Sequence, residues 1–329
     1  MNLKKKIENY ILLEFAYSWF GHLNFMVDKK VLLESHGSIS QIDDYVTSFE
    51  KVVEENIKQM KAHDSDSLIF SMKRDDFPFD TFFDIIDCQV SIKESNDETE
   101  GISGGYVDSK SGLFDGKYTV KIYIIYAGPI IDAPWKCGQY FSHEITHAYE
   151  SYSRKMKGGE SFEEYKERTG QENVVTQLFY GNEKDIKTTI ANVLYYVSDA
   201  EIHASVAEMR REIQHGIRFV NNNQDATELL YRTTAWENYE YSEGIYNTLY
   251  SYRTNEKYND FRNCVIVSFN ELTGYNARTY NQVVKYIGKQ VRKFGKKIFD
   301  NGVKMLGDEM NKIMKETMIT IRGKRTPII

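Results

Sequence analysis

The 329-residue chain has no long apolar run, and its mean hydropathy is −0.53. Its apolar stretches are short, such as Ile122–Ala127, whereas a membrane-spanning helix needs about 18 or more apolar residues. Near the N-terminus, Glu8 and Glu14 interrupt the apolar residues that follow three lysines. We therefore expect neither a secretory signal peptide nor a transmembrane segment.

Cysteine and proline are scarce, with three and four residues. The cysteines, Cys88, Cys137 and Cys264, are odd in number and widely spaced, which argues against a disulfide framework and against a thiol-rich metal site. Such cysteine use suits an intracellular or virus-like origin better than secretion. The few prolines, 24 tyrosines and abundant Asn, Lys and Ile are typical of an AT-rich genome.

What the chain does contain is apolar material for a sizeable core, with 41% hydrophobic and 14% aromatic residues. That composition excludes global disorder. The net charge of −6 is unevenly distributed. Residues 281–329 hold 12 Lys+Arg and 4 Asp+Glu, a net of +8, which leaves −14 on residues 1–280. The sequence therefore predicts an acidic body with a basic tail.

Hydrophobic periodicity predicts an α+β fold with a small mixed β-sheet and a mostly helical C-terminal half. Helices are expected at 3–20, 40–62, 136–155, 161–179, 184–197, 199–216, 225–252 and 276–318. Strands are expected at Ser67–Met72, Phe82–Ile92 and Lys117–Tyr126, and Asp97–Gly116 has the composition of a loop or hairpin. We divide the chain into N-terminal helices (1–62), sheet and central helix (63–156), a helical subdomain (157–275) and a basic C-terminal helix (276–329).

The predicted helix at 136–155 contains His143-Glu144-Ile145-Thr146-His147, an HExxH motif. Residues i and i+4 share a helix face, so both imidazoles can point at one metal ion. Two imidazoles and one further protein ligand leave tetrahedral Zn²⁺ with one position open to water. Glu144 can approach that water as a general base without itself binding the metal. The alternative is a core helix whose histidines align by chance.

These residues resemble the zincin metallopeptidases, and the resemblance covers Lys117–Tyr126, the HExxH helix and a later helix with the third ligand. It implies a zincin-like fold in which an edge strand before the active-site helix pairs with extended substrate. Lys117–Tyr126, with Val120, Ile122 and Ile124 on one face, is the expected edge strand. An ordinary core strand is the alternative.

The third ligand is predicted to be Glu201, 54 residues after His147. Ser198 or Asp199 can cap a helix, which places Glu201 in its first turn beside apolar residues, and a carboxylate there is costly unless it is paired or bound to metal. The surrounding Tyr-Tyr…Glu-Ile-x-Ala block is similar to one in gluzincin-like proteins, many of them from phages or bacterial mobile elements. Asp199, His203 and Glu167, which has the thermolysin-type spacing, are the alternatives. Glu150 and Ser153 replace the glycine and histidine that metzincins require.

Three other side chains are candidate accessory groups. His203 could bind the metal or donate to a reaction intermediate, and the phenols of Tyr195 and Tyr196 could stabilise a developing oxyanion. With 24 tyrosines in the chain, core packing is the simpler role for each tyrosine. Glu150, Glu160 and Asp199 are candidates to accept the second ring N–H of a ligand histidine.

The C-terminal segment 284–318 has apolar residues at helical spacing with lysines and arginines between them. Such a basic amphipathic helix could dock on a protein partner, and nucleic acid or a membrane surface fits less well because no aromatic platform or known module accompanies it. The alternative is a terminal helix packed on the domain with a solvated lysine face.

From these observations we expect a zinc-dependent metallopeptidase that hydrolyses peptide or protein substrates, located in the cytoplasm or associated with a virion. The alternative is a phage structural or delivered virion protein that keeps a zincin-like fold and docks through its basic C-terminal helix. The composition and the charge asymmetry motivate that alternative.

Overall fold

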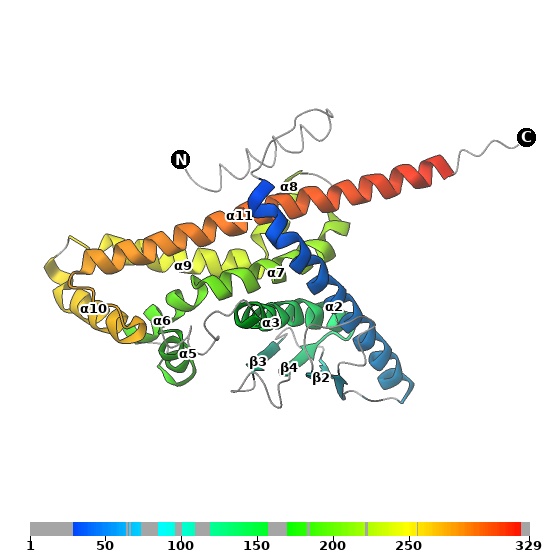
Figure 1. The fold of residues 1–329 in the computed structure, drawn as a ribbon, viewed down its shortest axis with the longest axis horizontal. Coiled ribbons are helices and arrows are strands. Elements are labelled where there is room, and N and C mark those ends of the chain that lie inside the picture. The colour runs from blue at the N-terminus through cyan, green and yellow to red at the C-terminus, as the bar shows by residue number, and fades with distance from the viewer. Residues whose placement is uncertain are drawn as a thin grey trace, which may run out of the picture.

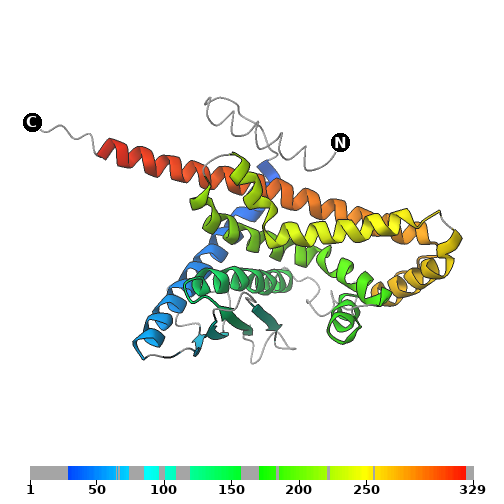
Figure 2. The same ribbon diagram turned by 180° about the vertical axis from the view of Figure 1, so that it is seen from behind.

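The computed structural model of the chain is a mixed α+β protein (Figures 1 and 2). It describes residues 29–63, 65, 67–73, 85–95, 101–108, 119–156, 170–182, 185–220, 223–254 and 256–323. The α-helices are α2 (Lys29–Ala62), α3 (Ala133–Met156), α5 (Gln171–Tyr180), α6 (Ile186–Tyr196), α7 (Asp199–Gly216), α8 (Asn223–Tyr231), α9 (Thr234–Ser251), α10 (Asn259–Thr273) and α11 (Tyr280–Gly323).

The sheet is mixed and its strands lie in the order β1-β2-β4-β3. The strands are β1 (Ser67–Lys73), β2 (Ile85–Glu94), β3 (Gly101–Asp108) and β4 (Thr119–Gly128). β1 pairs with β2 and β3 with β4 in antiparallel fashion, whereas β2 and β4 are parallel. The register sets Val90 beside Ile124 and Ile92 beside Tyr126, so that apolar residues of neighbouring strands form rows on one face.

Strand β4 has the predicted alternation but not the predicted position. Val120, Ile122 and Ile124 are buried, whereas Tyr123 and Ile125 on the opposite face are exposed. Because β2 and β3 occupy both sides of β4, its backbone groups are already paired. The prediction that Lys117–Tyr126 is an edge strand presenting Val120, Ile122 and Ile124 to substrate is therefore wrong.

Helices α2 and α3 cover the apolar face of the sheet and form one core with it. The rings of Phe49 on α2 and Phe141 on α3 stack with their centroids 4.3 Å apart. Ile145 and Ala148, inside and just after the HExxH motif, are fully buried in the same core. The sheet therefore fixes α3, and with it the direction in which the opposite face of α3 points.

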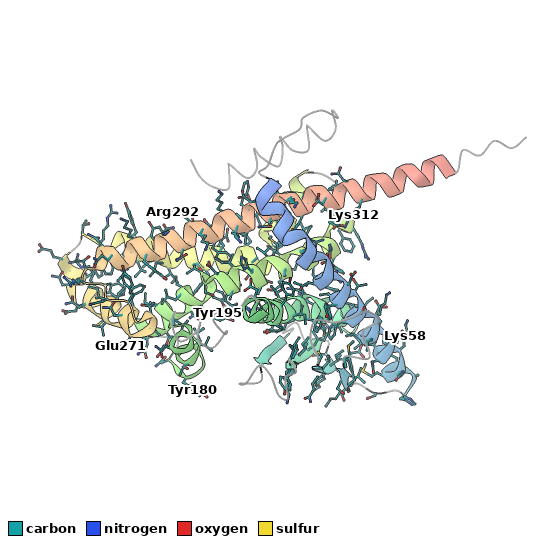
Figure 3. All side chains as sticks on the ribbon, viewed as in Figure 1. Lys58, Tyr180, Tyr195, Glu271, Arg292 and Lys312 are labelled. Carbon is teal, nitrogen blue, oxygen red and sulfur yellow. The ribbon has the colours of Figure 1, made fainter. Side chains whose placement is uncertain are left out.

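The helices from α5 to α11 form a second core. In both views α7 lies between α3 and the pair α9 and α11, so the molecule is layered from the sheet outward (Figures 1 and 2). The predicted basic amphipathic helix is α11: Ile287, Val291 and Phe294 are buried, whereas lysines between them are exposed. Arg292 projects from the outer side of α11 (Figure 3).

Most predicted elements overlap observed ones, with four differences. The helix predicted at 40–62 begins at Lys29, eleven residues earlier. The segment 97–116, expected to be a loop or hairpin, contains strand β3. The single helix expected at 225–252 is split into α8 and α9, because Thr233 caps a new helix and accepts a hydrogen bond from the Trp236 backbone N–H. Helix α10 was not expected. The helix predicted at 3–20 lies outside the described residues.

Among the described helices, none combines the length and the apolar character needed to cross a bilayer.

Gly170, which precedes α5, allows a test of how the helical half is held together. Its φ is +70°, and a Cβ there would lie 2.2 Å from the carbonyl oxygen of Leu272 on α10. Gly274 has a similar φ of +66° but open space around it. Both Gly→Ala substitutions incur a conformational cost of about 1 kcal/mol, and only Gly170→Ala adds a backbone clash. We expect the urea midpoint of Gly170→Ala to fall well below that of Gly274→Ala, and equal midpoints would contradict this packing.

Candidate metal centre

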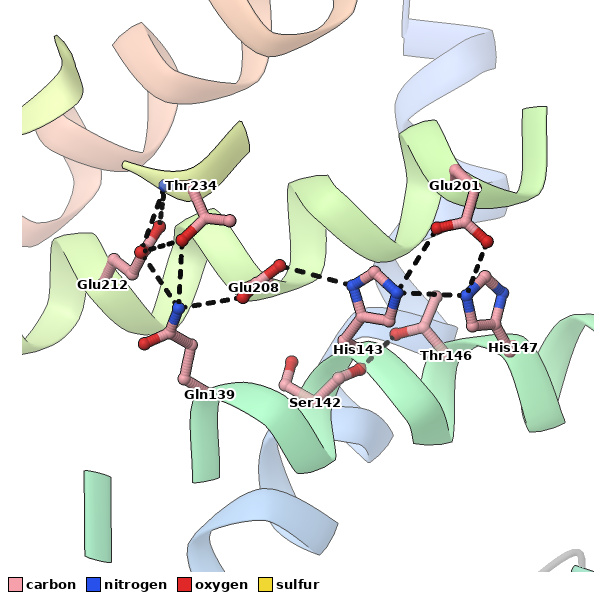
Figure 4. A network of polar contacts seen from close by, with 9 residues as sticks. All are labelled: Gln139, Ser142, His143, Thr146, His147, Glu201, Glu208, Glu212 and Thr234. Atoms are coloured by element: carbon pink, nitrogen blue, oxygen red, sulfur yellow. Dashed lines mark hydrogen bonds and ion pairs between the residues drawn. The ribbon is translucent and has the colours of Figure 1, made fainter. Parts of the chain in front are cut away.

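Helix α3 presents both histidines of the HExxH motif to α7. Its apolar side, including Phe141 and Ile145, belongs to the core formed with the sheet, and His143 and His147 point toward α7 (Figure 4). The hydroxyl of Thr146, between them in sequence, donates to the Ser142 carbonyl oxygen at 2.7 Å. The motif therefore sits on a regular helix with the i, i+4 geometry that the sequence predicts.

Glu201 enters the same site from the first turn of α7. Ser198 is the N-cap of this helix, and its hydroxyl accepts a hydrogen bond from the Glu201 backbone N–H at 3.3 Å. The Glu201 side chain is only 6% exposed. The capped first turn thus directs a buried carboxylate between the two imidazoles, as Figure 4 shows.

One donor atom from each of His143, His147 and Glu201 lies within 4.8 Å of the other two. Nε2 of His143 lies 3.2 Å from Nε2 of His147, Glu201 Oε2 lies 3.4 Å from the first, and Glu201 Oε1 lies 3.3 Å from the second. Zinc bonds of about 2.0–2.1 Å at tetrahedral angles place neighbouring ligand atoms about 3.3–3.4 Å apart. Two imidazoles and one carboxylate are also a donor set that suits Zn²⁺. The three residues therefore fit a single zinc ion.

The electrostatics of the site favour a cation between the ligands. Burial alone would raise the pKa of Glu201, but His147 and His143 hold it well below its ordinary value. Burial alone would lower the pKa of His143, but Glu201 and Glu208 raise it well above its ordinary value. The protein thus keeps the Glu201 carboxylate ionised in a buried place, which is costly unless positive charge accompanies it.

Glu144 is buried beside the ligands and is only 6% exposed. Burial raises its pKa, an effect that His143 and His147 oppose and that Glu201 and Glu208 reinforce. A carboxyl group whose pKa is moved up toward neutrality is suited to take up and return a proton. This is the environment that the predicted role of Glu144 as a general base requires.

Two residues that sequence reasoning missed complete the surroundings of His143. Glu208, two turns after Glu201 on α7, places Oε2 3.3 Å from Nδ1 of His143, and its Oε1 accepts a hydrogen bond from Gln139 Nε2 at 2.9 Å (Figure 4). The seven-residue spacing of Glu201 and Glu208, and the four-residue spacing of Gln139 and His143, were the signals that could have indicated this pairing.

The candidate partners for the ligand histidines lie elsewhere. Glu150 contacts Nδ1 of His203, and Asp199 forms an ion pair with Lys293 at 2.5 Å. Glu160, like the alternative third ligand Glu167, lies outside the described residues. Glu208 therefore takes the place beside His143 for which Glu150 and Asp199 were considered, and Glu160 stays untested.

Of the three predicted accessory residues, Tyr195 lies at the site, whereas Tyr196 and His203 lie beside it. Burial and the carboxylates of Glu201 and Glu144 raise the pKa of Tyr195 well above its ordinary value, so Tyr195 stays a neutral O–H group close to the ligands. Tyr196 is half-buried and packs its ring between Tyr195 and Tyr241, at centroid distances of 5.5 and 6.0 Å. His203 is 2.7 Å from Lys297 Nζ through Nε2 and belongs to a separate ion cluster.

No family model, no curated protein and no solved structure matches this chain.

The buried carboxyl group of Glu212 accepts a hydrogen bond from the side-chain amide of Gln139. Its environment predicts that the stability of the fold depends on pH. Burial, and then repulsion from Glu208, raise the pKa of Glu212 to about 8 from an ordinary 4.5. The folded chain therefore binds this proton more tightly than the unfolded chain, so the contribution of Glu212 to stability falls as pH rises between these values.

In Glu212→Gln this proton is absent, so the variant should gain stability relative to wild type by up to about 1.4 kcal/mol per pH unit between pH 5.5 and 8. Urea unfolding at several pH values measures the difference. Glu271→Gln, which removes an exposed carboxylate paired with Lys187, is the control and should show little pH-dependent difference. A Glu212→Gln difference that stays flat with pH would contradict the burial argument.

Proposed function

We propose that the chain is a zinc-dependent metallopeptidase of the gluzincin-like type, with the zincin-like arrangement of a small sheet behind an HExxH helix. The observation that carries the proposal is the cluster of His143, His147 and Glu201, whose two Nε2 atoms lie 3.2 Å apart and whose two carboxylate oxygens lie 3.3 and 3.4 Å from one imidazole each. A bound zinc ion would polarise a peptide carbonyl and lower the pKa of a water molecule toward neutrality.

The remaining steps fall to the side chains around the ligands. Glu144 takes a proton from the attacking water and returns it to the leaving amine. Tyr195, held neutral by its buried position beside Glu201, would donate a hydrogen bond to the oxyanion that develops on the carbonyl. His203 takes no direct part, because its ring contacts Glu150 and Lys297.

The sheet offers a peptide substrate one edge next to α3. Strand β3 is at the end of the strand order, pairs with β4 on one side and packs against α3. An extended peptide can add to such an edge through backbone hydrogen bonds, and its scissile bond would then run along the HExxH helix. In this proposal β3 has the substrate-pairing role that the interior strand β4 does not have.

The role of Glu144 can be tested with Glu144→Gln, which removes the base but keeps its shape. We expect the variant to retain one zinc ion per chain and to lose peptidase activity by about 10²–10⁴-fold. Metal analysis and cleavage of an unstructured protein such as casein measure the two properties. The surface variant Glu237→Gln is the control and should keep both. Freshly purified wild type without zinc, or full activity in Glu144→Gln, would refute the proposal.

The third ligand can be tested with two carboxylates from the same turn of α7. Glu201→Gln removes a ligand, and we expect zinc affinity to fall by more than the about 10–100-fold that loss of an outer-shell partner costs. Asp199→Asn is the matched control, since Asp199 is half exposed and pairs with Lys293 on the surface. Competition with a chromogenic chelator measures both. Equal affinities in the two variants would assign the third ligand elsewhere.

A virion or delivery role with docking through α11 is the second candidate function. It is favoured by a row of exposed cations on this helix, Lys285, Lys289, Arg292 and Lys296. Since the apolar stripe of α11 is already buried in the chain, a partner would contact mainly this charged face. The two functions are compatible, and a monomer that cleaves protein without any partner would argue against a purely structural role.

A further inference from the structure

The three ligand residues on α3 and α7 form one end of a longer row of buried polar groups. Toward the N-terminal end of α3, the contacts continue from His143 through Glu208 and Gln139 to Glu212, and end at Thr234 on α9 (Figure 4). These residues come from three helices, and Gln139 and Glu208 are each 6% exposed. Apart from His143, the row lies beyond the three ligand residues.

Gln139 is the branch point of this row. Its Nε2 donates to Glu208 Oε1 at 2.9 Å and to Glu212 Oε1 at 3.0 Å, and Thr234 Oγ1 lies 3.3 Å away. An amide –NH₂ has two hydrogens, so these two carboxylates use its full donor capacity. Glu208 and Glu212 are one helical turn apart on α7, and the Gln139 amide bridges them.

The far end of the row is fixed at the start of α9. Both oxygens of Glu212 lie 3.1 Å from the Thr234 backbone N–H, and Oε1 also accepts from Thr234 Oγ1 at 2.8 Å. Backbone N–H groups in the first turn of a helix have no partner within the helix and favour an acceptor. Glu212 therefore anchors Gln139 to the N-terminus of α9.

The near end of the row determines which ring nitrogen of His143 is free. Glu208 is an acceptor, and its Oε2 is 3.3 Å from Nδ1. This contact is at an ion-pair distance, and a hydrogen on Nδ1 facing that carboxylate would leave the lone pair on Nε2, the atom that faces His147 and Glu201. The position of Glu208 thus bears on both the tautomer and the orientation of a ligand.

We propose that Gln139 is a positioning residue of the metal site, which holds Glu208 against Nδ1 of His143 and connects this contact through Glu212 to the N-terminus of α9. The inference rests on the proposed zinc site and adds that zinc affinity depends on a side chain that does not touch the metal. If Gln139 acts through Glu208, removing either residue should have the same consequence, and removing both should add little.

The test is a double-mutant cycle on zinc affinity with Gln139→Met, Glu208→Gln and the double variant. Methionine keeps the length of the side chain and removes its donors. Each single variant should bind zinc about 10-fold or more weakly, and the double variant should be within about twofold of the weaker single variant. Affinity is measured by chelator competition, and the melting temperature of each metal-free variant is recorded beside it.

Gln177→Met is the matched control, because Gln177 Nε2 also donates to a buried partner, Thr188 Oγ1 at 3.0 Å, but in α5 and α6. It should keep wild-type zinc affinity whatever its effect on melting. If Gln139→Met does not fold, Thr234→Val tests the same row from its far end and should still weaken zinc binding by about threefold or more.

The outcomes separate the two proposals. Wild-type affinity in Gln139→Met or, where that variant does not fold, in Thr234→Val would overturn the positioning role and leave the zinc site intact. Losses that simply add in the double variant would also overturn it, because two residues acting independently give additive effects. A wild-type protein that binds no zinc would overturn the proposed function and the positioning role together.

Discussion

The packing of α3 against α7 is the constraint on which the site depends. It brings His143, His147 and Glu144 from one helix into the same buried space as Glu201 and Glu208 from the other. Ionised carboxylates in such a place are stable only with positive charge or hydrogen-bond donors around them. The identity of the residues on both helices is therefore coupled, and a change on one helix leaves an uncompensated group on the other.

This interface lies between the two apolar cores of the molecule. Helix α3 belongs to the core built with the sheet, and α7 belongs to the helical core. Each core consists of its own apolar residues, and the polar layer between them forms only if the two cores are correctly placed. Ion pairs reinforce the placement, since Arg210 and Arg211 of α7 reach Asp43 and Glu50 of α2 at 2.7 and 2.5 Å. A cation held by residues of both helices would tie the two cores together from within.

Local periodicity explains which parts of this arrangement could be predicted from the sequence. The i, i+4 histidines, the first-turn position of Glu201 and the buried face of β4 each depend on a period within one element. The pairing order of strands does not, so a loop-like composition concealed β3 and made β4 look like an edge strand. Likewise Gln139 and Glu208 are ordinary polar residues on their own helices. Only the antiparallel approach of α3 and α7 brings them together.

The charge asymmetry of the sequence also has a different meaning in the folded chain. The basic tail is not a separate appendage through residue 306, because its apolar stripe is part of the helical core. With that stripe buried, α11 cannot insert the same face into a bilayer, and its exposed lysines interact only through charge. Two lysines of α11 already contact other side chains of the chain: Lys293 pairs with Asp199, and Lys297 contacts His203. These contacts are made at Asp199 and His203, two residues before and two residues after Glu201 on α7.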